Sequence, residues 1–162
     1  MNLKIMITLV AAISKNNCIG KQGGIPWNIP EDMKRMREIT RGKVLVMGRK
    51  TWESIPKERR PLPDRTNAVI TRDQNYALPA GVERYDTIDK ALQAHAGQDI
   101  FGFGGQRVFE EMIKIADILD ITLVDQIVDK CDAFFPEIDL GIWKEVERED
   151  HEGYSFVVYK RK

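Results

Sequence analysis

The sequence predicts one α/β domain spanning residues 1–162, with a central, mostly parallel, twisted sheet, flanking helices and a C-terminal antiparallel hairpin. Short apolar runs alternate along the chain with segments that carry helix-start signals, which is the pattern of strand–helix–strand units. The runs are apolar almost throughout, as in 44–48, which is typical of parallel strands covered on both faces. The segments 143–149 and 154–159 instead alternate in polarity across a short turn, and they predict the hairpin.

The composition excludes several classes of protein. The 162 residues include 25 Lys and Arg and 25 Asp and Glu, so the chain has no net charge. This balance argues against a general nucleic-acid binder and against a polybasic membrane attachment. No apolar run approaches membrane-spanning length, and the apolar opening of the chain fits a buried strand better than a signal peptide.

The cysteines and histidines carry a prediction about compartment and metal. Cys18 and Cys131 are far apart in sequence, so we expect two reduced thiols in a cytoplasmic protein. Neither these cysteines nor His95 and His151 fall at metal-ligand spacing, so no metal site is predicted.

The first strand is expected over 5–13. Its Ala11 and Ala12 are small, which suits either a flat ligand lying against the backbone or tight packing of a helix on the sheet. The polar segment 14–24 follows and contains several glycines, so we expect a mobile loop that acts as a lid.

The next helix begins near Pro30, which suits a first helical turn, and Gly42 is expected to end it. Asp32 lies in its first turn, where the helix dipole favours negative charge. If the helix turns Met33 and Met36 inward, Asp32 comes round to the edge of an apolar wall. The alternative is that Asp32 faces water and serves only the dipole.

A buried strand over 44–48 runs into a helix over 49–55 whose first turn holds Arg49, Lys50 and Thr51. Cations at this end of a helix interact unfavourably with the helix dipole, so another interaction should compensate for them. A bound phosphate is the simplest candidate. A solvated basic turn is the alternative reading.

The connector 56–65 is rich in proline, which stiffens it and holds Arg65 at its end. A fixed guanidinium beside an apolar surface suits an acidic substrate, because it binds a carboxylate through two parallel hydrogen bonds. An exposed arginine without function is the other reading of Arg65.

Strands are expected over 67–71 and 82–85, with a helix from Thr87, its N-cap, to His95. Ligands of parallel sheets sit at the carboxyl ends of the strands. Both Arg49 and Arg72 follow strands there, which suits a nucleotide that carries an extra phosphate.

The segment 99–109 reads as a strand, a glycine turn and a helix start. Gly104 and Gly105 let the backbone approach a pyrophosphate, although a tight turn alone also requires glycine. The dinucleotide-binding pattern G-x-G-x-x-G fails because Arg107 occupies the third position. The strand over 118–124 carries Thr122, which serves strand propensity or, if it lies beside Asp32, bridges the carboxylate and a bound heterocycle.

The order and spacing of these motifs resemble those of bacterial-type dihydrofolate reductases over essentially the whole chain. The matching segments are Leu9-Val10-Ala11-Ala12, Ile19-Gly20, Ile25-Pro26-Trp27, Asp32, 47–55, 61–65, Gly104-Gly105, Thr122, and Asp132 before Phe135-Pro136.

The resemblance implies NADPH-dependent reduction of 7,8-dihydrofolate to tetrahydrofolate, which supplies one-carbon metabolism. It also implies a cytoplasmic monomer that binds antifolate inhibitors, with no nucleic-acid or membrane partner. The catalytic residues implied are Asp32, Trp27 and Thr122. Asp32 orients the pterin and acts electrostatically, Trp27 helps to fix solvent, and the proton reaches the ring nitrogen through water.

By the same resemblance, the substrate-binding residues are Val10, Ala12, Ile25, Asp32, Met33, Met36, Ile55, Leu62, Arg65, Phe103, Phe109 and Thr122, with Arg65 on the glutamate carboxylate. The cofactor-binding residues are Ala12, Ile19, Gly20, Gly48, Arg49, Lys50, Thr51, Ile70, Thr71, Arg72, Phe103, Gly104, Gly105, Gln106, Arg107, Val108 and Phe109.

The chain departs from the family pattern at several positions. Met36 stands where an aromatic residue is common, and Phe109 where tyrosine is frequent. Phe103 replaces an aliphatic residue, Gln106 a glycine, and Cys131 the small residue before Asp132. Two rival functions remain: a reductase of the same fold acting on another pterin-like or pyrimidine substrate, as in riboflavin synthesis, and a non-catalytic nucleotide-binding module. The combination of Asp32, Trp27 and Arg65 argues against the first.

Overall fold

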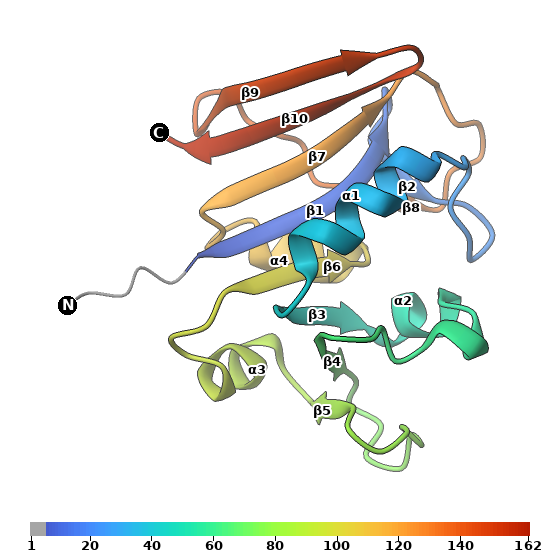
Figure 1. Cartoon of the computed structure of the whole chain (residues 1–162), viewed down its shortest axis with the longest axis vertical. Coiled ribbons are helices and arrows are strands. Elements are labelled where there is room, and N and C mark those ends of the chain that lie inside the picture. Colours follow the sequence, from blue (N-terminus) through green and yellow to red (C-terminus); the bar gives the residue numbers. More distant parts are fainter. Residues whose placement is uncertain (1–5) are drawn as a thin grey trace.

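The computed structural model describes residues 6–162 and contains one eight-stranded sheet with helices on both faces (Figure 1). The sheet strands are β1 (Ile7–Ser14), β3 (Val44–Gly48), β4 (Thr66–Ile70), β5 (Glu83–Tyr85), β6 (Ile100–Gly104), β7 (Ile118–Val124), β9 (Trp143–His151) and β10 (Tyr154–Arg161). The helices are α1 (Pro30–Thr40), α2 (Arg49–Ser54), α3 (Ile88–Ala94) and α4 (Gln106–Met112), with a 3₁₀ turn at Lys57–Arg59.

The strand order is β5-β4-β3-β6-β1-β7-β10-β9. Neighbours from β5 to β7 pair in parallel, whereas β10 pairs antiparallel with both β7 and β9. The predicted fold class is therefore confirmed, including the C-terminal hairpin. Ile5, the expected first residue of the first strand, lies outside the described residues. The Thr87 hydroxyl accepts a hydrogen bond from the Lys90 N–H and caps α3 as predicted.

Two short strands were not expected from the sequence: β2 (Cys18–Gly20) and β8 (Ala133–Phe134). They form a separate antiparallel pair, and β2 lies within the segment 14–24 that was expected to be a mobile loop. A strand of two or three residues has no polarity period to detect, which explains why the pattern of the sequence does not reveal them.

The prediction of two reduced thiols is wrong for this structure. Cys18 and Cys131 form a disulfide, with their Cα atoms 5.9 Å apart although 113 residues separate them in sequence. The pairing of β2 with β8 brings the two cysteines together. Sequence separation gave no indication of this proximity, because the contact is made by the fold and not by local structure.

Two apolar clusters cover the two faces of the sheet. One contains Leu9 of β1, Ala91 of α3 and Met112 of α4; the other contains Val10 of β1 and Trp52 of α2, with Met36 of α1 packed against it. In Figure 1, α1 crosses the front of the sheet and α4 lies behind it. Because successive residues of a strand point to opposite faces, β1 contributes to both clusters.

Gly102 is placed where no side chain fits easily. A Cβ there would lie 2.5 Å from Cδ2 of Leu9 and 3.0 Å from Sδ of Met112, both of which are fully buried. We expect Gly102→Ala to lower the free energy of unfolding by about 1–3 kcal/mol, because the core must repack around the methyl group. Gly24→Ala is the matched control, since its Cβ would meet only the Lys21 carbonyl, at 3.9 Å. Urea unfolding of both variants measures the difference, and equal stabilities would contradict the packing described for β6.

Candidate functional site

The Asp32 carboxylate is held between α1 and β7. Pro30 begins the helix, so Asp32 lies in the first turn, and its Oδ1 accepts a hydrogen bond of 2.5 Å from the Thr122 hydroxyl. Thr122 is buried, whereas Asp32 is partly buried. The structure therefore favours the reading in which Asp32 faces the sheet over the one in which it faces water.

Burial raises the pKa of Asp32, because a charged carboxylate loses solvation there. The hydrogen bond from Thr122 and the nearby Arg35 guanidinium act in the opposite direction, and the Asp120 carboxylate raises the pKa further. A pKa raised by burial and opposed by specific neighbours is a common property of functional carboxyl groups.

An ion pair that the sequence reasoning missed lies beside this carboxylate. Arg35, one turn after Asp32 on α1, hydrogen-bonds Asp120 of β7, and both side chains are largely buried. The Arg35 guanidinium also lies 4.9 Å from the ring centroid of Phe156. The available signal was the spacing of three residues between Asp32 and Arg35, which places them on the same side of a helix.

Val10 and Ala12 line the same face of the sheet as this pair. They lie in register with Asp120 and Thr122 of the neighbouring strand, and paired residues of adjacent strands project to one face. The small Ala12 side chain therefore lies next to Thr122. Ala11 packs against the cluster on the opposite face, in agreement with the packing reading for that residue, whereas the ligand-facing reading of Ala12 stays a prediction.

Four predicted substrate-binding residues gather in one place. Met36, Ile55, Leu62 and Phe103 are partly buried and pack against the apolar cluster on the α1 face. They come from four separate segments of the chain and form an apolar wall, whose member Met36 lies one turn after Asp32 on α1. Two other predicted substrate-binding residues, Ile25 and Met33, are exposed, with exposed fractions of 69% and 39%. The expected inward turn therefore holds for Met36 and is wrong for Met33.

Phe109 lies deeper than its predicted role in binding both ligands suggests. It is 3% exposed and packs against Phe135, with 4.9 Å between ring centroids. Its ring edge touches the backbone of Gly104, where an added Cβ would lie 3.3 Å away. Phe109 therefore supports the glycine turn from the core.

The indole N–H of Trp27 is buried and has no hydrogen-bond acceptor among the described residues. A buried donor without an acceptor costs free energy, so such a group is expected to meet water or a ligand. Trp27 lies on the loop that leads into α1, five residues before Asp32.

Arg65 is fixed in position by neutral groups. Its Nε donates to the Thr40 hydroxyl at 2.8 Å, and its terminal nitrogens donate to the carbonyls of Pro63 and Arg37. Burial and the nearby Arg41 and Arg37 lower the pKa of the Arg65 guanidinium. A guanidinium has five N–H groups, and within residues 6–162 no carboxylate hydrogen-bonds to this one, so it retains donors for an anion.

Three predicted cofactor segments converge at the glycine turn after β6. A Cβ on Gly104 or Gly105 would lie 3.4 or 3.3 Å from the Thr51 hydroxyl, and one on Gly48 would lie 3.8 Å from Val108. Side chains at these glycines would fill the space that faces Thr51. The glycines thus keep side chains away from the backbone beside the Thr51 hydroxyl, which is what close approach of a phosphate group requires.

The predicted phosphate-binding arginine Arg49 is engaged by acidic groups. Its guanidinium donates to Glu53 at 2.6 Å, lies 3.5 Å from Asp73, and stacks over the ring of Tyr76 at 4.0 Å. The hydrogen bond to Glu53 raises the pKa of Arg49. Lys50 and Arg72 are exposed beside it, and Ile70 and Thr71 at the end of β4 are partly buried.

The remaining predicted cofactor residues lie on two facing segments. Ile19 and Gly20 belong to β2, and Gln106 at the start of α4 accepts a hydrogen bond of 2.9 Å from the Phe134 N–H of β8. Arg107 is exposed.

An open hollow elsewhere, lined by residues such as Lys15, Glu137 and Tyr159, contains none of the predicted site residues. None of the helices within 6–162 has the length and apolar character required to span a membrane.

Comparisons with known proteins show which family this chain resembles over its length. The family model described as dihydrofolate reductase matches residues 6–161. The dihydrofolate reductase of Neisseria meningitidis serogroup A is 42% identical over 164 residues, covering 97% of this chain and 99% of the relative. Dihydrofolate reductase type 3 of Salmonella typhimurium is 38% identical and covers 91% and 88% of the two chains.

A solved structure extends the agreement to three dimensions. Dihydrofolate reductase from Enterococcus faecalis, complexed with NADP(H) and RAB-propyl, has a TM-score of 0.85 at 32% identity, covering 97% of this chain and 96% of that one. Both the match to the family model and the identity to full-length relatives span nearly the whole sequence. The chain belongs to the dihydrofolate reductase family.

Proposed function

We propose that the chain, acting as one domain over residues 1–162, catalyses the NADPH-dependent reduction of 7,8-dihydrofolate to 5,6,7,8-tetrahydrofolate. The observation that carries the proposal is the Asp32 carboxylate, held by Thr122 at the edge of an apolar wall. A pterin ring needs such a setting, because its flat faces are apolar while one edge presents an amino group and a ring nitrogen. Asp32, Trp27 and Thr122 are the proposed catalytic residues.

Asp32 orients the substrate and stabilises charge. In its charged form the carboxylate accepts hydrogen bonds from the pterin amino edge, while Thr122 holds one of its oxygens in place. The ring nitrogen must gain a proton in the reduction. We assign its delivery to water, with Asp32 orienting the substrate and acting electrostatically. The unpaired Trp27 N–H is suited to fix that water, because it is a buried donor that requires an acceptor.

The cofactor site is proposed at the carboxyl ends of the parallel strands. When bound there, NADPH supplies the hydride. Gly104, Gly105 and Thr51 would hold the pyrophosphate, because the glycines expose backbone N–H groups beside the Thr51 hydroxyl. Arg49 and Arg72 would bind the adenosine-side phosphate, for which Arg49 must exchange its contacts with acidic side chains for contacts with phosphate.

Arg65 is proposed to bind a carboxylate of the glutamate portion of the substrate. It is held by neutral acceptors at the end of the connector that carries Leu62, a member of the apolar wall. The aromatic middle of the substrate would then lie along that wall, between Asp32 and Arg65. We further propose that the chain acts as a cytoplasmic monomer and binds antifolate inhibitors through these residues.

A direct assay separates this function from its two rivals. Adding dihydrofolate to the protein with NADPH should reduce the absorbance of the NADPH band. A reductase for a different pterin-like substrate, or a nucleotide-binding module, would leave that absorbance unchanged. Binding of methotrexate, followed by tryptophan fluorescence, provides a second readout that does not depend on turnover.

Asp32→Asn tests the assigned carboxylate. We expect the variant to fold normally and to lose about 10²-fold or more of its activity at neutral pH, because the amide cannot accept both hydrogen bonds from the pterin edge. Activity should recover in part at low pH, where the substrate arrives already protonated. Glu31→Gln is the control, since it removes an exposed charge from the same helical turn. A variant as active as the parent at every pH would contradict the role of Asp32.

The Arg35–Asp120 pair should set the pH dependence of the reaction. Arg35 lowers the pKa of Asp32 and Asp120 raises it. Arg35→Gln should therefore move the acidic limb of the kcat/KM profile to higher pH, and Asp120→Asn should move it to lower pH. Profiles that keep their shape, with activity scaled by one factor at all pH values, would show that the pair serves packing alone.

The phosphate site is tested by cofactor preference. Replacing Arg49 and Arg72 with Gln should reduce the ratio of kcat/KM for NADPH to that for NADH by about tenfold or more, because charge-assisted hydrogen bonds to the extra phosphate are lost. Arg59→Gln, an exposed arginine of the 3₁₀ turn, is the control. A ratio that stays at the parent value would place the phosphate elsewhere.

A further inference from the structure

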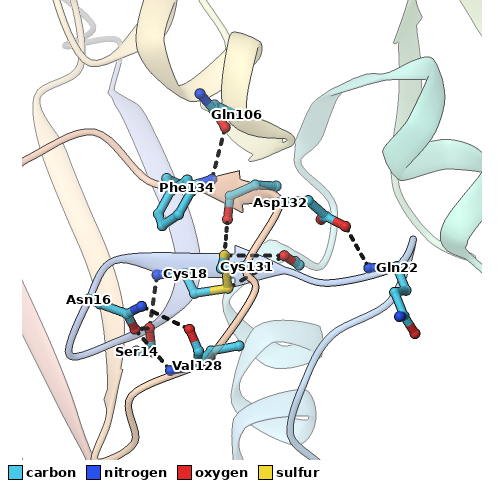
Figure 2. Close-up of a disulfide and its surroundings, with 11 residues drawn as sticks. Ser14, Asn16, Cys18, Gln22, Gln106, Val128, Cys131, Asp132 and Phe134 are labelled. Atoms are coloured by element: carbon cyan, nitrogen blue, oxygen red, sulfur yellow. Dashed lines mark hydrogen bonds between the residues drawn. A yellow bond between two sulfur atoms is a disulfide. The ribbon is translucent and has the colours of Figure 1, made fainter.

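The Cys18–Cys131 disulfide is positioned to control the segment beside the proposed cofactor site. Cys18 begins β2, and the next two residues, Ile19 and Gly20, are among the proposed cofactor-binding residues. Cys131 directly precedes Asp132, whose carboxylate accepts a hydrogen bond of 2.8 Å from the Gln22 N–H (Figure 2). The covalent bond thus holds the stretch 18–22 against 131–134.

The same contact reaches the glycine turn. The Phe134 N–H of β8 donates to the Gln106 side chain at 2.9 Å, and Gln106 begins the helix that follows Gly105 (Figure 2). A chain of direct contacts therefore runs from Cys18 through Cys131 and Phe134 to Gln106. A change at the disulfide acts on both sides of the proposed cofactor site.

Besides the disulfide, β2 and β8 are joined by their short antiparallel ladder and by flanking hydrogen bonds. The backbone contributes hydrogen bonds from Asp132 N–H to the Gly20 carbonyl at 3.2 Å and from Phe135 N–H to the Asn17 carbonyl at 2.8 Å. A pair of two or three residues per strand is marginal without further support. Since Gln22 and Asp132 are exposed, their hydrogen bond adds little against opening. The disulfide is therefore the strongest tie between the two segments.

The surroundings accommodate both oxidation states. The Cys131 sulfur lies 3.3 Å from the Gly20 carbonyl oxygen and 3.0 Å from that of Ala133, and the Cys18 sulfur lies 3.4 Å from the Gly20 oxygen. A disulfide sulfur carries no proton, so these contacts become hydrogen bonds only when the thiols are reduced.

The site is accessible from one side. Cys18 is completely buried, whereas Cys131 is partly exposed. A thiolate from solvent can therefore attack the Cys131 sulfur, breaking the S–S bond and releasing Cys18 as a thiolate that takes up a proton. In a cytoplasmic protein, a disulfide with this access belongs to the class that forms and breaks during redox sensing.

We propose that the Cys18–Cys131 bond is a reversible redox site, reduced by dithiols, that controls the opening of residues 15–24 beside the cofactor site. This rests on the proposed position of NADPH. In reduction, a dithiol forms a mixed disulfide with Cys131, its second thiol displaces Cys131 as a thiol, and the dithiol leaves as a cyclic disulfide after giving up two electrons. The reduced enzyme opens more readily and releases NADPH faster.

The test compares oxidised protein, prepared with glutathione disulfide, with protein reduced by dithiothreitol. Alkylation and mass measurement establish the thiol content of each. Hydrogen exchange of residues 15–24, measured without cofactor, should be at least threefold faster in the reduced form. The rate of NADPH release in stopped flow should rise by a similar factor. Equal exchange and release in the two forms, or free thiols in the oxidised preparation, would overturn the proposal.

The Cys18→Ser/Cys131→Ser variant is the matched control. Its hydroxyl groups can donate to the same carbonyl oxygens as the thiols. Its hydrogen exchange and NADPH release should therefore match those of the reduced protein and should not change when dithiothreitol is added. A response of this variant to dithiothreitol would assign the effect to another site and contradict the proposal. Protein that shows the redox-dependent exchange but binds no NADPH in either form would instead refute the proposed function and leave the redox site standing.

Discussion

The hydrogen bond between Asp32 and Thr122 is the interaction on which the rest of the site depends. It joins the first turn of α1 to the centre of β7, and so it fixes a carboxylate at the boundary between the apolar wall and solvent. Burial favours the neutral acid, whereas Thr122 and Arg35 favour the charged form. A bound heterocycle would lower the pKa of Asp32, because each hydrogen bond that it donates to the carboxylate stabilises the charged form. A surface aspartate has no such sensitivity, since water already satisfies its charge.

The parallel sheet explains how distant segments meet at this point. Because β6 and β3 end at the same edge, the turn after β6 and the start of α2 face each other, and Thr51 comes to lie against Gly104 and Gly105. The antiparallel hairpin has a different structural role. It extends the sheet beyond β7, and its Phe156 contacts Arg35. The fold therefore separates two tasks. The carboxyl edge of the parallel strands presents backbone N–H groups and cations, while one face of β1 and β7 presents the carboxylate.

Much of this arrangement could be predicted from the sequence. Uninterrupted apolar runs indicated buried parallel strands, and the order of the motifs indicated the family, which the comparisons support. What could not be predicted depends on contacts between segments far apart in sequence. The disulfide requires β2 to pair with β8, and neither strand is long enough to show a pattern. The Arg35–Asp120 pair joins residues separated by 85 positions, and each alone reads as a surface charge. The depth of Phe109 depends on its packing against Phe135, which no local signal reveals.

The ionisation of Asp32 offers the most direct test of this account. Carbon-13 NMR of protein labelled at the aspartate carboxyl groups, with the Asp32 signal assigned by its loss in Asp32→Asn, would follow the titration of this one group. In the free protein, its pKa should lie above the usual range of aspartate, and binding of an inhibitor with a pterin-like amino edge should bring it down. An ordinary pKa that does not respond to the ligand would place Asp32 outside the site and contradict the mechanism.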